Sequence, residues 1–495
     1  MLIPKLRLLS LIACGLLSGA GTSAAHADHE QRIAQLHKLL DRLPHPKAVV
    51  SAAVMSLPDG AIIYERNADR VLIPASNQKI IPGAVALAKL GVAYSFDTRL
   101  ALDGEDLIII GSGDPGLGDS QLADQRGGRP TDVFVQWAGI LTQRGISTIQ
   151  GDIVVEDHVF SQPWVHPSWE EGDLTKWYAA PAGGLNFNDN CIEITLRPTT
   201  PGELVRFEVF PPSAWIRIDN RCKTSPSKSK NKPWIHRPTS DPMYELRGRC
   251  NRKSELQAVS VPDPGIFTGE VLRAVLKSHG IYVRGKVRRA AQVAKSGAAD
   301  PRGREILAVH STPLADVLKR ALGDSQNLFA ECLMKSLSVR PVRDGQPAQA
   351  GSWQAGGAAA LETIRGWGID TSGMVIADGS GLSRDNRASA RQIVQILRHV
   401  YLDSAGGSLF MDSLSLNATR GTLRKRMKDI PGRVMAKTGY MRGVRSLSGY
   451  VQASPRVWYA FSVLFNDIPG GTAPYNRIHD DVCRALIGPE SVATE

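Results

Sequence analysis

Apolar residues recur at helical spacing between residues 30 and 43, on a face formed by Ile33, Leu36, Leu39, Leu40 and Leu43. This periodicity predicts an amphipathic helix. Two short runs with strand character follow at Val49–Ser56 and Ala61–Tyr64, and a Pro-Asp-Gly turn between them predicts a hairpin. A further helix is predicted near residue 76.

Three more strand candidates lie in a row near the C-terminus, at Arg433–Gly439, Val444–Ala453 and Val457–Asn466. A Ser-Pro turn separates the last two. Together with the N-terminal hairpin, they predict one five-stranded antiparallel sheet that is built from both ends of the chain and flanked by helices. The predicted class is therefore α/β, of the α+β kind.

The middle of the chain, from about residue 95 to 304, has short strands, many prolines and few long helices. Two of its segments look alike: Leu141–Val155 reads LTQRGISTIQGDIVV, and Leu276–Val287 reads LKSHGIYVRGKV. Both run from a helix end through Gly-Ile to a glycine and an alternating strand. This likeness predicts two related units in one inserted domain, and residues 156–253, rich in Pro, Trp and Lys, are predicted to be a further insert.

The first 27 residues have a different pattern. Lys5 and Arg7 precede an apolar stretch, and an Ala-His-Ala site ends at Ala27. This order predicts a secretory signal peptide, residues 1–27, and hence an exported, periplasmic protein. A lipoprotein box ending at Cys14 is the alternative. No other stretch approaches the ~18 uninterrupted apolar residues of a membrane span, so no transmembrane segment is predicted.

Composition adds few constraints. The chain has 495 residues, 42% of them hydrophobic and 22% charged, which is ordinary for a globular protein of about three domains. Beyond the signal peptide five cysteines remain, and Cys222 with Cys250 is the best candidate pair for a disulfide because they bracket one loop-rich segment. Neither Cys-x-x-Cys nor His-x-x-x-His spacing occurs, so no metal or cofactor is expected.

The net charge of +11 is partly local. Six basic residues crowd one Ser/Pro-rich stretch: Arg217, Arg221, Lys223, Lys228, Lys230 and Lys232. A solvated loop and an electrostatic contact with a membrane or an anionic wall polymer both fit this stretch. An exported chain without a recognisable binding module is not expected to bind nucleic acid. The oligomeric state, including a homo-oligomer, stays open.

Three short motifs carry the candidate chemistry. A Ser-x-x-Lys at residues 76–79 places Ser76 and Lys79 on one face of a helix start. A serine hydroxyl is a weak nucleophile that needs an adjacent base, and a desolvated lysine near other cations can lose its proton near neutral pH. Alone, this motif is usually a helix cap with a surface lysine.

A Ser-x-Asn follows at residues 325–327 and a Lys-Thr-Gly at 437–439. Ser325 would bridge two lysines and Asn327 would orient the substrate amide. Lys437 would bind a carboxylate or hold the pKa of Lys79 low, and Gly439 would let a substrate backbone lie close to the strand. In this order the three motifs are typical of penicillin-binding proteins and class A β-lactamases.

The chain resembles peptidase family S13, the class C low-molecular-mass penicillin-binding proteins of the D-alanyl-D-alanine carboxypeptidase/endopeptidase type. The resemblance rests on the motifs in their context: IPASNQK at 73–79, GSGDPGL at 111–117, YAAPAGGLNFNDN at 178–190, SQNLFAE at 325–331, DGSGLSRDNRAS at 378–389 and AKTGYMRGVRSLSGYV at 436–451. These segments are spread over nearly all of the mature chain, and the distance between the first two catalytic motifs is longer than a plain β-lactamase needs.

The resemblance implies a β-lactamase/transpeptidase-like catalytic domain with nested, mostly β insertions. We expect the catalytic domain over residues 28–94 and 305–495, an inserted domain II over 95–155 and 254–304, and a domain III over 156–253 inserted within domain II.

The resemblance also implies residue roles. Ser76 would attack the carbonyl of the penultimate D-alanine of a peptidoglycan stem peptide, with Lys79 as general base. Ser325 and Lys437 would pass a proton to the leaving amine. The remaining contacts would come from Asn327, from Thr438 and Lys437 to the terminal carboxylate, and from the backbone N–H groups of Ser76 and Tyr440 as the oxyanion hole. β-Lactam antibiotics would acylate Ser76 stably.

Three positions depart from the family pattern. Tyr440 follows Lys-Thr-Gly where the family usually has a small hydroxyl residue. Pro82 lies three residues after Lys79, so the helix must bend or restart there. Glu156 stands where the family often has an aspartate, four residues before Phe160, to bind the diamino-acid side chain of the substrate.

The leading hypothesis is an active carboxypeptidase, with D,D-endopeptidase activity as a further option on the same site. Two alternatives stay open: a non-catalytic peptidoglycan-binding pseudoenzyme, and a β-lactamase or esterase on the same scaffold. A Ser/His/Asp triad would require His310 or His399 near Ser76. Of the other residues, Asp114 is interpreted as a structural loop residue and Glu331 as a helix-face partner, while Asp378 and Ser380 are expected to shape the wall beside the site.

Overall fold

The computed structural model describes residues 19–226, 231–238, 240–290, 304–340 and 349–488, and side chains from residue 30 onward. Its main sheet has the strand order β19-β20-β21-β22-β1-β2 and is antiparallel throughout. The strands are β1 (Val49–Leu57), β2 (Ile62–Arg66), β19 (Ser415–Leu416), β20 (Val434–Met441), β21 (Val444–Ser454) and β22 (Val457–Asn466). All five predicted strands are present, and the short β19 adds a sixth at the edge.

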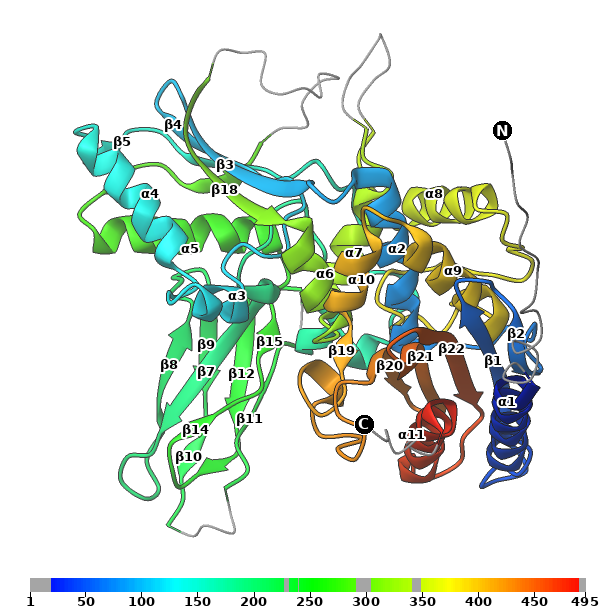
Figure 1. Ribbon diagram of the computed structural model, residues 1–495. Helices are drawn as coiled ribbons and strands as arrows, with labels where there is room; N and C mark the ends of the chain where they lie inside the picture. Colours follow the sequence, from blue (N-terminus) through cyan, green and yellow to red (C-terminus); the bar gives the residue numbers. More distant parts are fainter. Residues whose placement is uncertain (1–18, 227–230, 239, 291–303, 341–348, 489–495) are drawn as a thin grey trace, which may run out of the picture.

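The first strand of the chain pairs with the last. β1 lies between β2 and β22, with Val49 opposite Asn466 and Leu57 opposite Trp458. β1 is buried along most of its length because helices cover both faces of the sheet (Figure 1). The prediction that one sheet is built from both chain ends is therefore confirmed.

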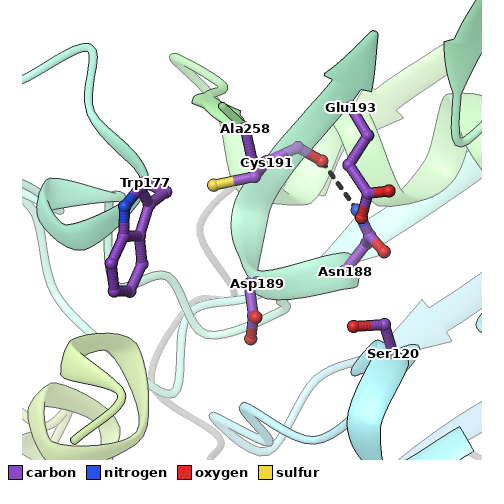
Figure 2. A pocket seen from close by; sticks show the side chains of 7 residues that line it. All are labelled: Ser120, Trp177, Asn188, Asp189, Cys191, Glu193 and Ala258. Atoms are coloured by element: carbon purple, nitrogen blue, oxygen red, sulfur yellow. Dashed lines mark hydrogen bonds between the residues drawn. The ribbon is translucent and has the colours of Figure 1, made fainter. Parts of the chain in front are cut away.

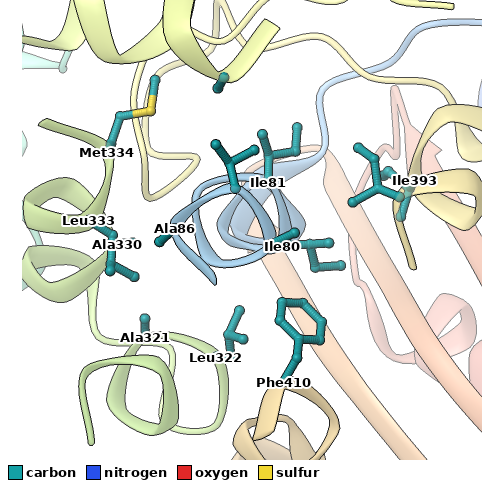
Figure 3. Packing of buried hydrophobic residues seen from close by; sticks show 14 of the residues in the cluster. Ile80, Ile81, Ala86, Ala321, Leu322, Ala330, Leu333, Met334, Ile393 and Phe410 are labelled. Carbon is teal, nitrogen blue, oxygen red and sulfur yellow. The ribbon is translucent and has the colours of Figure 1, made fainter. Parts of the chain in front are cut away.

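One face of the sheet is covered by a helical layer that carries most of the site. Its helices are η1 (Ala75–Lys79), α2 (Ile80–Leu90), α6 (Leu314–Leu322), α7 (Asn327–Ser336), α8 (Trp353–Gly366), α9 (Ala390–Leu402) and α10 (Gly407–Ser413). Figure 3 shows α2 at the centre of this layer, with Ile80 and Ile81 pointing outward among neighbouring helices. Burying each of these isoleucines contributes about 1.5–3 kcal/mol, so α2 is held firmly by its surroundings.

The opposite face is covered by α1 (Gly19–Leu40) and α11 (Ala473–Ile487). Leu36 and Leu40 of α1 are fully buried there, beside residues of α11 such as Leu486. The helix predicted from residue 30 to 43 begins at Gly19 and ends at Leu40. The predicted cleavage site after Ala27 lies within α1, and most of the predicted signal peptide, with Cys14, lies outside the described residues.

The segment between the catalytic motifs forms a second body with its own core. Its five-stranded sheet has the order β17-β6-β4-β3-β18. The strands are β3 (Ser95–Asp103), β4 (Asp106–Ile110), β6 (Ile153–Glu156), β17 (Val287–Arg289) and β18 (Glu305–Pro313), and the helices packed on them are α4 (Asp132–Gln143) and α5 (Pro264–Ser278). This part is thus less exclusively β than predicted.

The two look-alike segments form matching units. After α4 come β5 (Thr148–Ile149) and β6, and after α5 come β16 (Tyr282–Val283) and β17. β16 pairs with β5 and β17 with β6, both in parallel. The predicted pair of related units is confirmed by this arrangement.

A lobe of short strands projects from the second body (Figure 1). It runs through β7 (Cys191–Arg197), β8 (Arg206–Phe210), β9 (Arg217–Asn220), β10 (Lys223–Thr224), β11 (Trp234–His236), β12 (Met243–Arg247), β13 (Arg249–Cys250), β14 (Ser254–Glu255) and β15 (Val259–Ser260). Its apolar residues join the same core as the five-stranded sheet. The division of the chain into domains at residues 94, 155, 253 and 304 stays a prediction.

The disulfide expectation is wrong for this structure. Cys222 and Cys250 are buried free thiols, as are Cys191, Cys332 and Cys483. Cys222 immediately precedes β10, and in the parallel pairing of β10 with β13 it is Thr224 that lies opposite Cys250. The Cys250 thiol instead donates to the carbonyl of Arg252 at 2.9 Å.

Among the described residues, no helix combines the length and the apolar character needed to cross a membrane.

Candidate active site

Ser76 and Lys79 meet in η1. Lys79 Nζ donates to Ser76 Oγ at 3.1 Å, and the Lys79 side chain is fully buried. The helix restarts as predicted: η1 is a 3-10 helix, α2 begins at Ile80, and Pro82 lies in the first turn of α2. A residue without an N–H is tolerated in a first helical turn, so Pro82 leaves the spacing of Ser76 and Lys79 intact.

The Ser-x-Asn motif forms the turn between α6 and α7. Ser325 has a φ of 65°, a left-handed conformation that non-glycine residues rarely adopt outside constrained sites. Its hydroxyl accepts a hydrogen bond from Lys437 Nζ at 2.8 Å. The described contacts of Lys79 do not include Ser325, so the expected bridge between the two lysines is formed on the Lys437 side alone.

Asn327 begins α7 and already has protein partners at both ends of its amide. Its Oδ1 accepts from Lys79 Nζ at 2.7 Å, and its Nδ2 donates to the carbonyl of Tyr178 at 2.6 Å. Asn327 therefore orients Lys79 in this structure, and it joins the first motif to the segment that precedes the lobe.

The third motif lies on β20, whose outer edge is open beyond β19. Val434 bonds with Asn417 on that side, through both its carbonyl and its N–H. Because backbone groups alternate in direction along a strand, Thr438 and Tyr440 direct theirs to the same edge. β19 reaches only Ala436, so the Tyr440 N–H is left directed to the open side.

Gly439 also allows a close contact within the protein. A Cβ at this position would come within 1.9 Å of Ser446 Oγ and 3.2 Å of the Ser76 backbone nitrogen. The glycine thus lets β20 approach the turn that carries the nucleophile. The Asn77 amide adds to this contact: with its nitrogen 2.8 Å from the Lys437 carbonyl, its oxygen accepts from the Ser448 N–H at 3.1 Å.

The two lysines share a dry environment. Burial lowers the pKa of Lys79 to about 7, although the nearby charges of Glu331 and Asp378 oppose this shift. Burial, and then the charge of Lys79, hold the pKa of Lys437 well below its usual range. A neutral amine next to the Ser76 hydroxyl is therefore accessible near neutral pH.

A loop over residues 378–383 completes the surroundings of Lys79. The carbonyl of Ser380 accepts from Lys79 Nζ at 2.8 Å, and the N–H groups of Gly379 and Ser380 donate to Glu331 at 2.8 Å each. The sequence indicated Ser380 as part of the wall beside the site and Glu331 as a helix-face partner, but connected neither with Lys79. The four-residue spacing of Asn327 and Glu331 on one helix face was the signal that could have linked them.

Two predicted site residues are not joined to this cluster by the described contacts. Glu156 ends β6, where its carboxylate pairs with Arg304 at 2.8 Å. The ring of Tyr440 is 66% exposed and lies under the guanidinium of Arg445, 3.7 Å from the ring centroid. Tyr440 therefore contributes its backbone, rather than its side chain, to the open edge of β20.

A serine–histidine triad has no support. His310 lies beside Asp114, with 3.9 Å between Nε2 and Oδ2, and His399 stacks on Trp367. Asp114 itself is buried in its turn, where it accepts from the Gly116 N–H at 2.7 Å. The structural interpretation of Asp114 fits these contacts.

A pocket of about 90 Å³, whose lining residues are drawn in Figure 2, has Asp189 in its wall. Gln326, the middle residue of the Ser-x-Asn motif, donates to Asp189 at its wall, with 2.8 Å between Nε2 and Oδ2. The pocket is lined by Ser120, Trp177, Asn188, Asp189, Cys191, Glu193 and Ala258. The pocket is therefore next to the Ser-x-Asn turn, but no residue of the three motifs lines it.

Comparison with known proteins agrees with this geometry. Residues 32–484 match the D-Ala-D-Ala carboxypeptidase 3 (S13) family. The chain belongs to this family. A D-alanyl-D-alanine carboxypeptidase from Actinomadura sp. (strain R39) is 30% identical over 483 residues, which cover 92% of the S13 chain described here and 85% of that relative.

Solved structures support the S13 fold. Penicillin binding protein 4 from Haemophilus influenzae superposes with a TM-score of 0.72 at 22% identity, covering 92% of this chain and 99% of that chain. The Bd0816 predatory endopeptidase from Bdellovibrio bacteriovorus, solved with an immunity protein, has a TM-score of 0.51 at 15% identity, covering 90% and 96%. At these identities the likeness shows a shared fold, which agrees with the transpeptidase-like class expected from the motifs.

Proposed function

We propose that this S13 protein is a serine-type D-alanyl-D-alanine carboxypeptidase that hydrolyses peptidoglycan stem peptides through an acyl-enzyme on Ser76. The observation that carries the proposal is the 3.1 Å contact between Lys79 Nζ and Ser76 Oγ in a fully buried setting. Burial keeps Lys79 able to accept a proton, and the hydrogen bond places it where the serine proton leaves.

In the first half-reaction, Ser76 Oγ attacks the carbonyl carbon of the penultimate D-alanine while its proton passes to Lys79 Nζ. The backbone N–H groups of Ser76 and Tyr440 stabilise the resulting oxyanion. The C–N bond then breaks, and the Ser325 hydroxyl, bonded to Lys437 at 2.8 Å, delivers a proton to the departing amine of the terminal D-alanine. Lys437 and Thr438 bind the carboxylate of that residue.

In the second half-reaction, water attacks the ester carbonyl and gives a proton to the Ser325–Lys437 pair, which replaces the one delivered to the amine. The C–O bond to Ser76 breaks, Lys79 returns to Ser76 the proton that it had taken, and the shortened peptide leaves. Over the two half-reactions, one water molecule is consumed and one D-alanine is released. The same steps on a cross-link would be D,D-endopeptidase activity, and a β-lactam would leave a stable ester on Ser76.

Several further assignments belong to the same proposal. A peptidoglycan substrate places the enzyme outside the cytoplasm, which fits a periplasmic location with a signal peptide over residues 1–27. Glu156 remains a candidate for the diamino-acid side chain, provided that Arg304 releases it. Exposed Arg221 and Lys223 on the lobe support a contact with membrane or anionic wall polymer; Lys228 and Lys230 lie outside the described residues.

The test uses the chain without residues 1–27, a fluorescent penicillin and intact mass, with Ser76→Ala as the control. We expect one adduct per chain, lost in Ser76→Ala, and D-alanine release from a stem pentapeptide. No adduct on the folded protein would overturn the proposal and favour a peptidoglycan-binding pseudoenzyme. Rapid loss of the adduct, with turnover of penicillin, would instead favour a β-lactamase.

A further inference from the structure

Glu331 is a buried carboxylate outside the three motifs, and two of its three hydrogen bonds hold one loop. It lies one turn after Asn327 on α7 and has no exposed surface. Its Oε1 accepts from the Ser380 N–H at 2.8 Å. Its Oε2 accepts from the Gly379 N–H at 2.8 Å and from Trp353 Nε1 at 2.7 Å. Both oxygens are therefore committed to fixing this loop.

The loop in turn holds the proposed base. The Ser380 carbonyl accepts from Lys79 Nζ at 2.8 Å, so a single residue connects Glu331, through its N–H, with Lys79, through its C=O. Asp378 stiffens the same loop from within, because it accepts from the N–H groups of Gly381 at 2.8 Å and Ser383 at 2.6 Å. The loop cannot be displaced without changing the direction of the Lys79 ammonium.

We propose that Glu331 is a positioning residue for the acylation of Ser76: through the Ser380 peptide it orients Lys79 toward the serine hydroxyl, and its negative charge controls the pH at which Lys79 becomes the base. This inference rests on the proposed function. It concerns a residue that acts through another and that does not itself touch substrate.

The charges around Glu331 and Lys79 support the proposed control of the pH at which Lys79 becomes the base. Burial, and then Asp378, raise the pKa of Glu331 to about 7, the same range to which burial lowers the pKa of Lys79. The other charged groups facing this pair come from three elements: Asp378 from the loop, Lys335 from α7 and Lys437 from β20. His166 also faces this cluster: its ring lies 5.1 Å from that of Trp353, and burial lowers its pKa although the charge of Asp378 opposes this. The negative charge of Glu331 thus opposes the loss of a proton from Lys79, against the effect of burial.

Glu331→Gln removes the negative charge of the side chain and keeps its shape. The amide keeps the volume and one acceptor oxygen, but its NH₂ group faces an N–H donor and its charge is lost. Removing the charge stabilises the neutral form of Lys79, so the acid limb of the rate of penicillin acylation moves to lower pH. The misplaced Ser380 carbonyl lowers the plateau rate by on the order of tenfold or more.

Two variants accompany it. Trp353→Phe removes one hydrogen bond to Glu331 but keeps the carboxylate, so it should lower the plateau slightly and move the acid limb much less than Glu331→Gln does. Asp114→Asn is the matched control, since it neutralises another buried carboxylate that does not contact Lys79; its acid limb should equal that of the wild type.

Rates are measured per folded chain, by stopped-flow fluorescence of the penicillin adduct from pH 5 to 9, with the adduct on Ser76 verified by intact mass. An unchanged acid limb in Glu331→Gln, with only a smaller folded fraction, would assign Glu331 a purely structural role and overturn the inference. If the wild type forms no penicillin adduct, the proposed function itself fails, and this outcome can be told apart from a failure of the inference about Glu331.

Discussion

At Gly439 a single hydrogen atom determines how closely β20 approaches the nucleophile. The space that a side chain would fill is taken by Ser446 Oγ, the Pro74 carbonyl and the Ser76 nitrogen. A larger residue would first displace Ser446 Oγ, which donates to the Pro74 carbonyl at 2.7 Å, and would thereby disturb the turn that carries the nucleophile.

Gly439→Ala is therefore expected to lower the acylation rate by about 100-fold, since a 1 Å misplacement of reacting groups has an effect of this size. The measurement is the rate of penicillin adduct formation on the folded variant. Gly139→Ala is the matched control, because Gly139 lies in α4 with open space around it, and alanine there should leave the rate unchanged. A Gly439→Ala enzyme with the wild-type rate would contradict the close contact.

At the scale of elements, α7 presents three polar residues along one face. Asn327, Glu331 and Lys335 recur every four residues, and all three are directed into protein. Lys335 Nζ donates to the carbonyls of Ser161 and Ala182 at 3.1 Å each. This helix thus connects the proposed base, the 378–383 loop and the segments that lead to the lobe.

A second connection between elements is made by Arg289 of β17. Its Nε donates to Oδ1 of Asp157, which follows β6, at 2.9 Å. Its Nη2 donates to Oδ1 of Asp263, the N-cap of α5, at 2.7 Å. The Asp157 side chain is only 3% exposed. Removing the arginine would therefore leave a buried carboxylate without its counter-charge.

We expect Arg289→Met to destabilise the inserted body by about 3–5 kcal/mol, as is typical when one partner of a buried ion pair is removed. Urea denaturation followed by circular dichroism measures this change. The neighbouring Arg288→Met is the control: its guanidinium is 39% exposed, and loss of a surface pair changes stability by about 1 kcal/mol or less. Equal effects of the two substitutions would show that Arg289 is not a buried connection.

At the scale of the whole molecule, separate apolar cores lie on the two faces of the main sheet and in the inserted body. The core under α1 and α11 is assembled from residues at both ends of the chain. Arg32 Nη1, for example, donates to the Tyr459 hydroxyl at 2.9 Å. Damage to this core should spread across the main sheet without reaching the inserted body.

Leu36→Ala tests this separation. Truncating a fully buried leucine should destabilise the main sheet by about 2–5 kcal/mol. Hydrogen exchange followed by mass spectrometry should then show faster exchange in peptides from β1, β22 and α11, and unchanged exchange in β3, β4 and β6. Leu402→Ala is the control, because Leu402 is 49% exposed. Faster exchange throughout the chain would mean that the two bodies unfold as one.

Local sequence signals determined much of this protein. Alternation and turn residues predicted all five long strands of the main sheet, and residue spacing placed Ser76 beside Lys79, because both signals depend only on neighbours in the chain. The repeated Gly-Ile segments likewise predicted two matching units. The three motifs also predicted the family.

Only the tertiary structure decided contacts that depend on distant segments. It committed the Asn327 amide to Lys79 and Tyr178, set Gly439 against η1, left Cys222 and Cys250 unbridged, and brought Glu331 and Ser380 to the proposed base. Glu331 and Ser380 are separated by an entire helix and its connections, and no spacing rule extends that far. Whether a buried charge finds a partner is determined by packing, since desolvation and hydrogen bonding act between whatever groups the fold brings together.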